Sequence, residues 1–176
     1  MRFSETELSG VYLIELELSE DERGSFARSY CGDEFAEAGI DFSIAQANIS
    51  FNNFAGTIRG MHYQERPFEE SKVVRCTRGT IFDVVLDLRP ESNTYCQWFG
   101  VGLDSENRSA LLVPAGCAHG FQTLSDSTEV HYLMSESYRP DAAAGIRFDD
   151  PVFGVEWPMT VSSISDRDRH WPDFRP

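Results

Sequence analysis

The feature of this sequence that most constrains its fold is a repeated alternation of apolar and polar residues with a period of two. In residues 12–18, "YLIELEL", apolar side chains alternate with Glu15 and Glu17, and the turn-rich segment "SEDERG" follows. Further short segments of this kind, each ending near a turn residue, are 72–77, 80–90, 109–114, 119–124 and 128–138. A period of two places successive side chains on opposite faces of a strand. Many short strands separated by turns predict an all-β fold, either a sandwich or a closed barrel.

Residues 72–90 are predicted to form a β-hairpin that turns at Arg78-Gly79. In its second strand the apolar and acidic positions fall on different faces, with Phe82, Val84, Leu86 and Leu88 on one and Asp83 and Asp87 on the other.

Helical patterns are scarce in this chain. The segment "GDEFAEAGI" predicts one short helix, with Asp33 as the N-cap and Gly39 as the stop. The polar, proline-limited C-terminal segment 164–176 is better explained as a short helix or loop than as a strand.

Length and charge narrow the class of protein. A chain of 176 residues without repeats or linkers is predicted to form a single domain, residues 1–176. The net charge of −14 disfavours binding to nucleic acid or to an anionic membrane. No apolar run has the length of a membrane span or a signal peptide, so we expect a cytoplasmic protein. The four cysteines form no C-x-x-C pair and are expected to be reduced thiols: Cys31, Cys76, Cys96 and Cys117.

Two histidines follow glycines on predicted strands, His62 in "RGMHYQ" and His119 in "PAGCAHGF". His62 could be a catalytic base, a metal ligand or a buried structural histidine. The stretch "PAGCAH" at 114–119 resembles half of the metal-binding cupin pattern, whose other half needs His-x-His on the earlier strand. There His62 is followed by Tyr63 and Gln64, with no second histidine. Glu69 and Glu70 are near in sequence, but no closed ligand set is apparent, so no metal is expected. Met61 and Tyr63 alternate with His62 and are expected to point to the opposite face, into the core.

Acid–base chemistry would need a carboxylate to orient a histidine and a proton donor elsewhere. The candidate carboxylates are Asp83, Asp87, Asp166 and Asp168, and the candidate donors are Tyr63, Tyr132 and Tyr138. Lys72, the one lysine of the chain, could stabilise an enolate oxygen. Spacing alone selects none of these pairings. The residues by themselves therefore predict a β-rich domain with an acid–base pocket.

Eight segments, taken in order, resemble the dTDP-4-dehydrorhamnose 3,5-epimerase family of cupin-like sugar-nucleotide epimerases. They are "DERGSFARSY", "QANISFN", "GTIRGMHYQ", "KVVRCTRGTIFDVVLDLR", "VPAGCAHGFQTL", "EVHYLMSESYRP", "DDPVFGVEWP" and "SDRD". The resemblance implies a cupin-like jelly-roll β-sandwich with a few short helices, and a homodimer.

The resemblance also implies a reaction. Members of this family invert carbons 3 and 5 of a dTDP-4-keto-6-deoxyhexose through enolate intermediates, with a histidine base, a tyrosine acid and no cofactor. Three alternatives stay open: an epimerase acting at carbon 3 alone on a related nucleotide-linked 4-keto sugar, a metal-dependent cupin enzyme, and a binding protein that keeps the pocket without turnover.

The family's functional residues map onto positions of this chain. The resemblance implies His62 as the base, Asp168 as its carboxylate partner, Tyr132 as the acid and Lys72 beside the ketone oxygen. The implied substrate-binding residues are Arg23, Phe26, Gln46, Asn48, Arg59, Lys72, His119 and Arg167, with Arg23 and Arg59 on the diphosphate and Gln46 and Asn48 along the nucleotide.

Three positions depart from the family pattern. Arg28 and Ala143 stand where glutamates are usual, and Arg167 stands where a lysine is common. The implied catalytic set is intact, whereas the contacts to the nucleotide base stay open.

Overall fold

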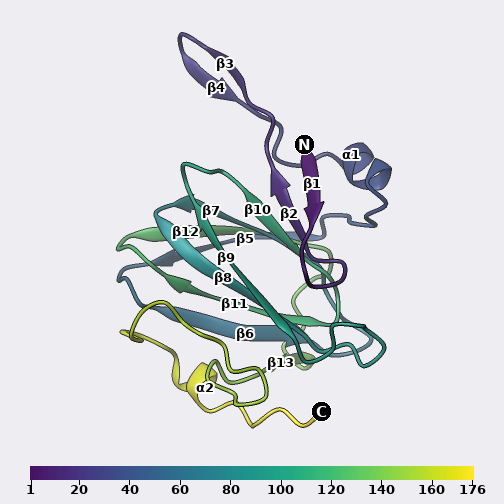
Figure 1. The fold of residues 1–176 in the computed structure, drawn as a ribbon, viewed down its shortest axis with the longest axis vertical. Helices are drawn as coiled ribbons and strands as arrows, with labels where there is room; N and C mark the ends of the chain where they lie inside the picture. The colour runs from purple at the N-terminus through teal and green to yellow at the C-terminus, as the bar shows by residue number, and fades with distance from the viewer.

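Two antiparallel β-sheets, packed face to face, make up most of the computed structural model, which describes residues 1–176 (Figure 1). The first sheet has six strands in the order β1 (Arg2–Glu5), β2 (Tyr12–Glu15), β10 (Ala110–Val113), β7 (Lys72–Arg78), β12 (Thr128–Met134) and β5 (Gln46–Asn52). The second has five, in the order β13 (Ala143–Gly145), β6 (Ile58–Gln64), β11 (Cys117–Thr123), β8 (Thr80–Asp87) and β9 (Trp98–Asp104).

Only three small elements lie outside these sheets. They are the hairpin of β3 (Ser19–Asp21) and β4 (Gly24–Phe26), and the helices α1 (Gly32–Glu37) and α2 (Asp166–Arg169). The expected all-β jelly-roll sandwich with a few short helices is confirmed, because nearly all regular structure is in the two facing sheets.

The main core lies between the sheets and receives side chains from both. Val74 and Val130 enter it from the first sheet, and Val85, Leu103 and Phe121 from the second. These are the inward positions of alternating strands, so the period-two pattern translates directly into the core.

Smaller apolar clusters cover the outer faces of the sheets. Phe35 of α1 packs on the first sheet beside Ile14 and Val73. The C-terminal segment covers the second sheet, where Phe153 and Ile146 join Met61, Val84 and Leu86 in one cluster. This covering brings α2 next to β6, and the position of α2 matters for the functional site.

The predicted hairpin of residues 72–90 is wrong. β7 pairs with β10 and β12, whereas β8 pairs with β11 and β9, so the two strands lie in different sheets. Gly79, at φ +80°, turns the chain from one sheet to the other. A hairpin and such a corner require the same alternation, because in both cases each strand has one face toward the core. As predicted, Phe82, Val84 and Leu86 lie on the face of β8 opposite to Asp83 and Asp87. The two aspartates are fully buried on the inner face, which they share with the core residues Ile81 and Val85.

The helix at "GDEFAEAGI" is present, but its predicted N-cap is wrong. Cys31 is the N-cap, without a capping side chain, and Asp33 lies in the first turn. There its carboxylate faces the positive end of the helix, which is a favourable position as well. The helix ends before Gly39, as predicted. The short α2 in the C-terminal segment is also confirmed.

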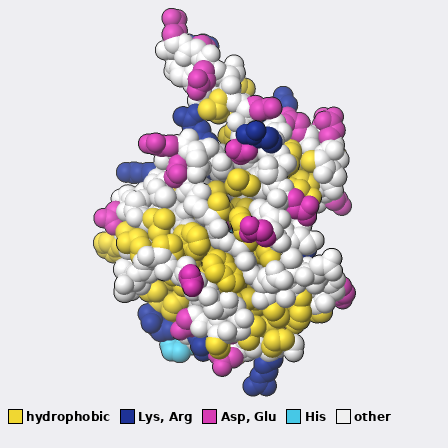
Figure 2. Space-filling view, in the orientation of Figure 1, with side chains coloured by type: hydrophobic (Ala, Val, Ile, Leu, Met, Phe, Trp, Pro, Cys, Tyr) yellow, Lys and Arg dark blue, Asp and Glu magenta, His cyan; other side chains and the backbone are white.

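Acidic side chains are spread over the visible face of the molecule and over the tip of the β3–β4 hairpin (Figure 2), in keeping with the net charge. No helix of the chain is both long and apolar enough to span a bilayer.

Candidate active site

A cavity of about 350 Å³ opens at one end of the sandwich, where the inward positions of the strands change from apolar to polar. On β7 the inward series runs from Cys76 and Val74 in the core to Lys72 in the cavity. On β12 it runs from Val130 to Tyr132 in the same way. The alternation that places apolar side chains in the core therefore also directs the candidate catalytic side chains into the cavity.

His62 projects from β6 and is paired with Asp168 of α2. Its Nε2 lies 2.6 Å from Asp168 Oδ1, and the side chain of His62 is 45% exposed while that of Asp168 is 7% exposed. Burial raises the pKa of the Asp168 carboxyl, but hydrogen bonds from His62, Gly60 and Ser165 outweigh burial and hold it below its usual value. The carboxylate is thus ionised and can only accept, so the hydrogen is on Nε2. In the neutral imidazole the lone pair is then on Nδ1, and this nitrogen can take a proton.

The backbones of β6 and β11 approach each other closely next to the pair of His62 and Asp168. A Cβ on Gly60 would lie 2.5 Å from the Cα of Gly120, and Gly60 has φ +143°. Only glycine fits such a position. β6 and β11 therefore pass each other tightly, and His62 stands directly opposite His119 in their register.

His119 forms a second, more deeply buried pair. Its Nε2 lies 2.8 Å from Oδ1 of Asp83, and the two side chains are 4% and 0% exposed. The ring of His119 also meets that of Tyr132 edge-on, with centroids 6.1 Å apart. Asp83 was one of four candidate orienting carboxylates, and it reaches His119, not His62.

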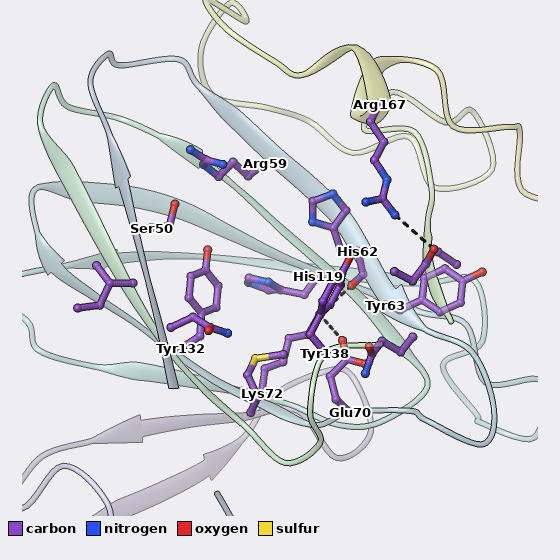
Figure 3. A pocket seen from close by; sticks show the side chains of 16 residues that line it. Ser50, Arg59, His62, Tyr63, Glu70, Lys72, His119, Tyr132, Tyr138 and Arg167 are labelled. Carbon is purple, nitrogen blue, oxygen red and sulfur yellow. Dashed lines mark hydrogen bonds and ion pairs between the residues drawn. The ribbon is translucent and has the colours of Figure 1, made fainter. Parts of the chain in front are cut away.

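Tyr132 comes from the opposite sheet and faces His62 across the cavity, with His119 between them (Figure 3). Burial raises the pKa of its phenol well above the ordinary value, and the negative charge of Asp83 adds to the rise. Tyr132 therefore keeps its proton at neutral pH and can donate it.

Lys72 extends along the floor of the cavity beside Glu70. Its Nζ donates to the carbonyl of His62 and contacts Glu70 Oε1, both at 2.9 Å. The side chains of Lys72 and Glu70 are 6% and 4% exposed. Loss of one partner from a buried ion pair typically costs about 3–5 kcal/mol, so each charge depends on the other.

Four further sequence-derived binding residues lie at or near this cavity. Arg59 donates from Nε to Asn52 at 2.7 Å and lines the wall. Arg167 also lines the cavity, with its guanidinium stacked 4.8 Å from the Trp171 ring. Asn48 lines it from β5, whereas Gln46 lies at the start of that strand and donates to Asn48 Oδ1 at 2.9 Å.

Arg23 and Phe26 are not brought to this cavity by their own chain. Both belong to the β3–β4 hairpin, which projects from the body of the molecule (Figure 1). Arg23 pairs with Asp21 on the same hairpin, and Phe26 is 77% exposed. Of the positions that depart from the family pattern, Arg28 pairs with Glu34 away from the cavity, whereas Ala143 forms part of its wall.

Several lining residues were not among the sequence-derived binding residues. Ser50 and Met134 line the cavity, as do Glu70 and the ring of Tyr138. Ser50 could have been found from its spacing, because it lies two residues after Asn48 on the same face of β5. The expectation for Met61 is met, since it is fully buried. Tyr63 packs against the same cluster but also borders the cavity, so it is only partly a core residue.

No three histidine, cysteine or carboxylate side chains gather in a way that could hold a metal ion. The jelly-roll fold, the two histidine–aspartate pairs and the buried tyrosine and lysine around one cavity together define a cupin-like protein with an acid–base site.

Comparison with known proteins places the chain within this class. Residues 5–176 match the family model described as dTDP-4-dehydrorhamnose 3,5-epimerase. The dTDP-4-dehydrorhamnose 3,5-epimerase of Methanothermobacter thermautotrophicus is 43% identical over 99% of this chain and 95% of its own length. The dTDP-4-dehydrorhamnose 3-epimerase of Streptomyces niveus is 39% identical over 96% of this chain and 82% of its own.

A solved structure agrees. The dTDP-4-dehydrorhamnose 3,5-epimerase of Bacillus anthracis, with TDP and pyrophosphate bound, superposes with a TM-score of 0.95 at 39% identity, covering 98% of this chain and 99% of that one. This chain therefore belongs to the dTDP-4-dehydrorhamnose 3,5-epimerase family, a family of isomerases.

Proposed function

We propose that this chain inverts carbons 3 and 5 of a dTDP-4-keto-6-deoxyhexose, with the ketone of the substrate as the electron sink. The observation that carries this proposal is that His62 and Tyr132 face each other from different sheets across one cavity, with Lys72 beside them. Inversion of a carbon needs a base on one face of the sugar and an acid on the other.

In this proposal each inversion consists of two proton transfers. His62 takes the proton next to the ketone, and the electron pair moves onto the 4-keto oxygen, where the Lys72 ammonium stabilises the enolate. Tyr132 then donates a proton to the opposite face of the carbon. His62 releases its proton to water and Tyr132 regains one, so hydrogen from the solvent enters the product.

The test follows from that exchange. In deuterated buffer, the chain is expected to introduce deuterium at carbons 3 and 5 of dTDP-4-keto-6-deoxyglucose, as followed by proton NMR. Exchange at neither carbon would contradict the proposal. Exchange at carbon 3 alone would reassign the chain to the 3-epimerases, which the similarity to the Streptomyces niveus protein makes worth testing.

We further propose that the chain acts as a homodimer in which the partner completes the nucleotide site. Phe26 is exposed on the projecting hairpin, where a second copy could receive it. On the outer face of the first sheet, Ile49 and Phe51 of β5 are 66% and 48% exposed. Arg75 lies in the same row as Ile49, and its Nε and Nη2 are buried without a hydrogen-bond partner. An apolar face next to unpartnered donors is suited to a self-complementary interface.

The interface can be tested by adding one charge to it. Wild-type protein is expected to sediment at twice the chain mass of 19.9 kDa, and Phe51→Asp is expected to shift it to the monomer, because a buried carboxylate would lack a partner. Val152→Asp, at a comparably exposed apolar residue on the C-terminal segment, is the matched control and should stay dimeric. A monomeric wild type would contradict the proposal.

A further inference from the structure

Glu70 is a buried carboxylate to which the reaction as proposed assigns no role. It lies two residues before Lys72, in the connection between β6 and β7, and is 5% exposed. Its Oε1 lies 2.9 Å from Lys72 Nζ, while its Oε2 is buried without any hydrogen-bond partner. Among the polar groups around it, Glu70 is thus paired with Lys72 alone. Burying a carboxylate with one unpartnered oxygen costs free energy of folding, so Glu70 is expected to have a function that offsets this cost.

The contacts of Lys72 indicate what the function of Glu70 is. An ammonium has three N–H donors; Lys72 donates one of them to the carbonyl of His62, and Oε1 of Glu70 lies 2.9 Å from its Nζ as an ion-pair partner. Together these two contacts hold Nζ in one place. Lys72 lines the cavity, and Figure 3 shows its side chain beside Glu70. Donor capacity of the ammonium is thereby left for a ligand in the cavity.

We propose that Glu70 is a positioning residue, which holds the Lys72 ammonium at the point where the 4-keto oxygen of the substrate gains negative charge. The inference rests on the proposed function, since it takes the enolate oxygen as the ligand of Lys72. Lysine has a flexible four-carbon stem, so an acceptor at its end is needed to keep the charge in one place. A displacement of about 1 Å in a catalytic group can cost about 10²-fold in rate. The bond from Lys72 to the His62 carbonyl also links this charge to the strand that carries the base.

A purely structural ion pair would have a different consequence. It would stabilise the folded chain without setting where the ammonium points, so its loss would leave turnover of the folded protein unchanged. A positioning residue instead acts on kcat, because the enolate oxygen carries full charge only beyond the ground state.

The position of the Lys72 ammonium can be followed directly by NMR, because the chain has a single lysine. Lys72 is the one lysine in 176 residues, so protein labelled with ¹⁵N-lysine has a single side-chain ammonium signal in NMR. In the wild type its protons should exchange slowly with water, since the ammonium is buried, donates to the carbonyl of His62 and is paired with Glu70. In Glu70→Gln the signal should shift, and in Glu70→Ala it should be broadened by rapid exchange.

Turnover should fall less in Glu70→Gln than in Glu70→Ala. We expect kcat to fall about 10-fold in Glu70→Gln, which keeps an acceptor oxygen without the charge, and about 10²-fold in Glu70→Ala. KM and the affinity for dTDP should stay within about twofold, because the contact proposed for Lys72 is with the ketone oxygen of the sugar and not with the nucleotide. If Glu70→Ala does not fold, Glu70→Gln carries the test by itself.

Glu69→Gln is the matched control, because it makes the same change one residue away. Glu69 pairs with Arg66 at 3.2 Å outside this cavity, so neither the lysine signal nor kcat should change in that variant. An unchanged ammonium signal in Glu70→Gln, or an unchanged kcat in the folded variant, would overturn the inference. The lysine signal is recorded without substrate, so it tests whether Glu70 holds Lys72 independently of turnover. If the wild type exchanges neither carbon, the proposed function is rejected, but the lysine signal still supports or refutes the contact between Glu70 and Lys72.

Discussion

Replacing His62 with asparagine is expected to reduce deuterium exchange at carbons 3 and 5 to the background level. The imidazole is the base in the proposed reaction, and asparagine fills similar space without an accessible lone pair of comparable basicity. A positioned general base contributes about 10²–10⁴-fold, so the loss in rate should be of that size. Proton NMR in deuterated buffer measures it directly, on the same substrate that tests the wild type.

The matched control is His170→Asn. His170 caps α2 on the surface, where its Nδ1 lies 2.7 Å from the carbonyl of Asp166, and it takes no part in the cavity. This variant should exchange both carbons at the wild-type rate. Exchange by His62→Asn within a few-fold of the wild-type rate would show that another group removes the protons.

The Tyr132→Phe variant is expected to separate inversion from exchange. Without the phenol, no acid protonates the far face, so inversion should slow by about 10²–10⁴-fold. Removal of the proton by His62 should continue. Because the side chain of His62 is 45% exposed, the captured proton can be replaced by deuterium from solvent and returned to the same face. Deuterium should then enter the starting sugar with retention of configuration.

The measurement follows both processes in one NMR sample, deuterium incorporation in the starting sugar and formation of the inverted product. Tyr95→Phe removes a hydroxyl outside the cavity and should alter neither rate. If exchange and inversion fall equally in Tyr132→Phe, the assignment of base and acid to separate residues is wrong.

The strands and the direction of their side chains were predictable from the sequence to a large extent. The alternating segments at 72–77, 80–90 and 128–138 contain the strands β7, β8 and β12, of which β8 ends at Asp87 and β12 at Met134, and their inward residues contribute to the core and the cavity. The resemblance to a family added residue roles to that pattern, and the cavity contains His62, Lys72, His119 and Tyr132 together. Their individual roles are what the variants above test.

Other features could not be predicted, and each depends on contacts between distant segments. The sequence between β7 and β8 suggested a hairpin, whereas the strands joined different sheets. Asp168 reaches His62 across 106 residues because the C-terminal segment covers the second sheet, and Asp83 pairs with His119 across 36. The local sequence pattern did not predict that Glu70 would be buried against Lys72.

The sequence by itself determined where several of the strands lie and which of their side chains share a face, because a period of two is a local property of the backbone and of neighbouring side chains. The tertiary structure alone decided which sheet each strand joins, which carboxylate meets which histidine, and that Arg23 and Phe26 stand apart from the cavity. These outcomes arise from packing between residues far apart in the chain, and such packing is specified by the whole set of long-range contacts rather than by any one segment.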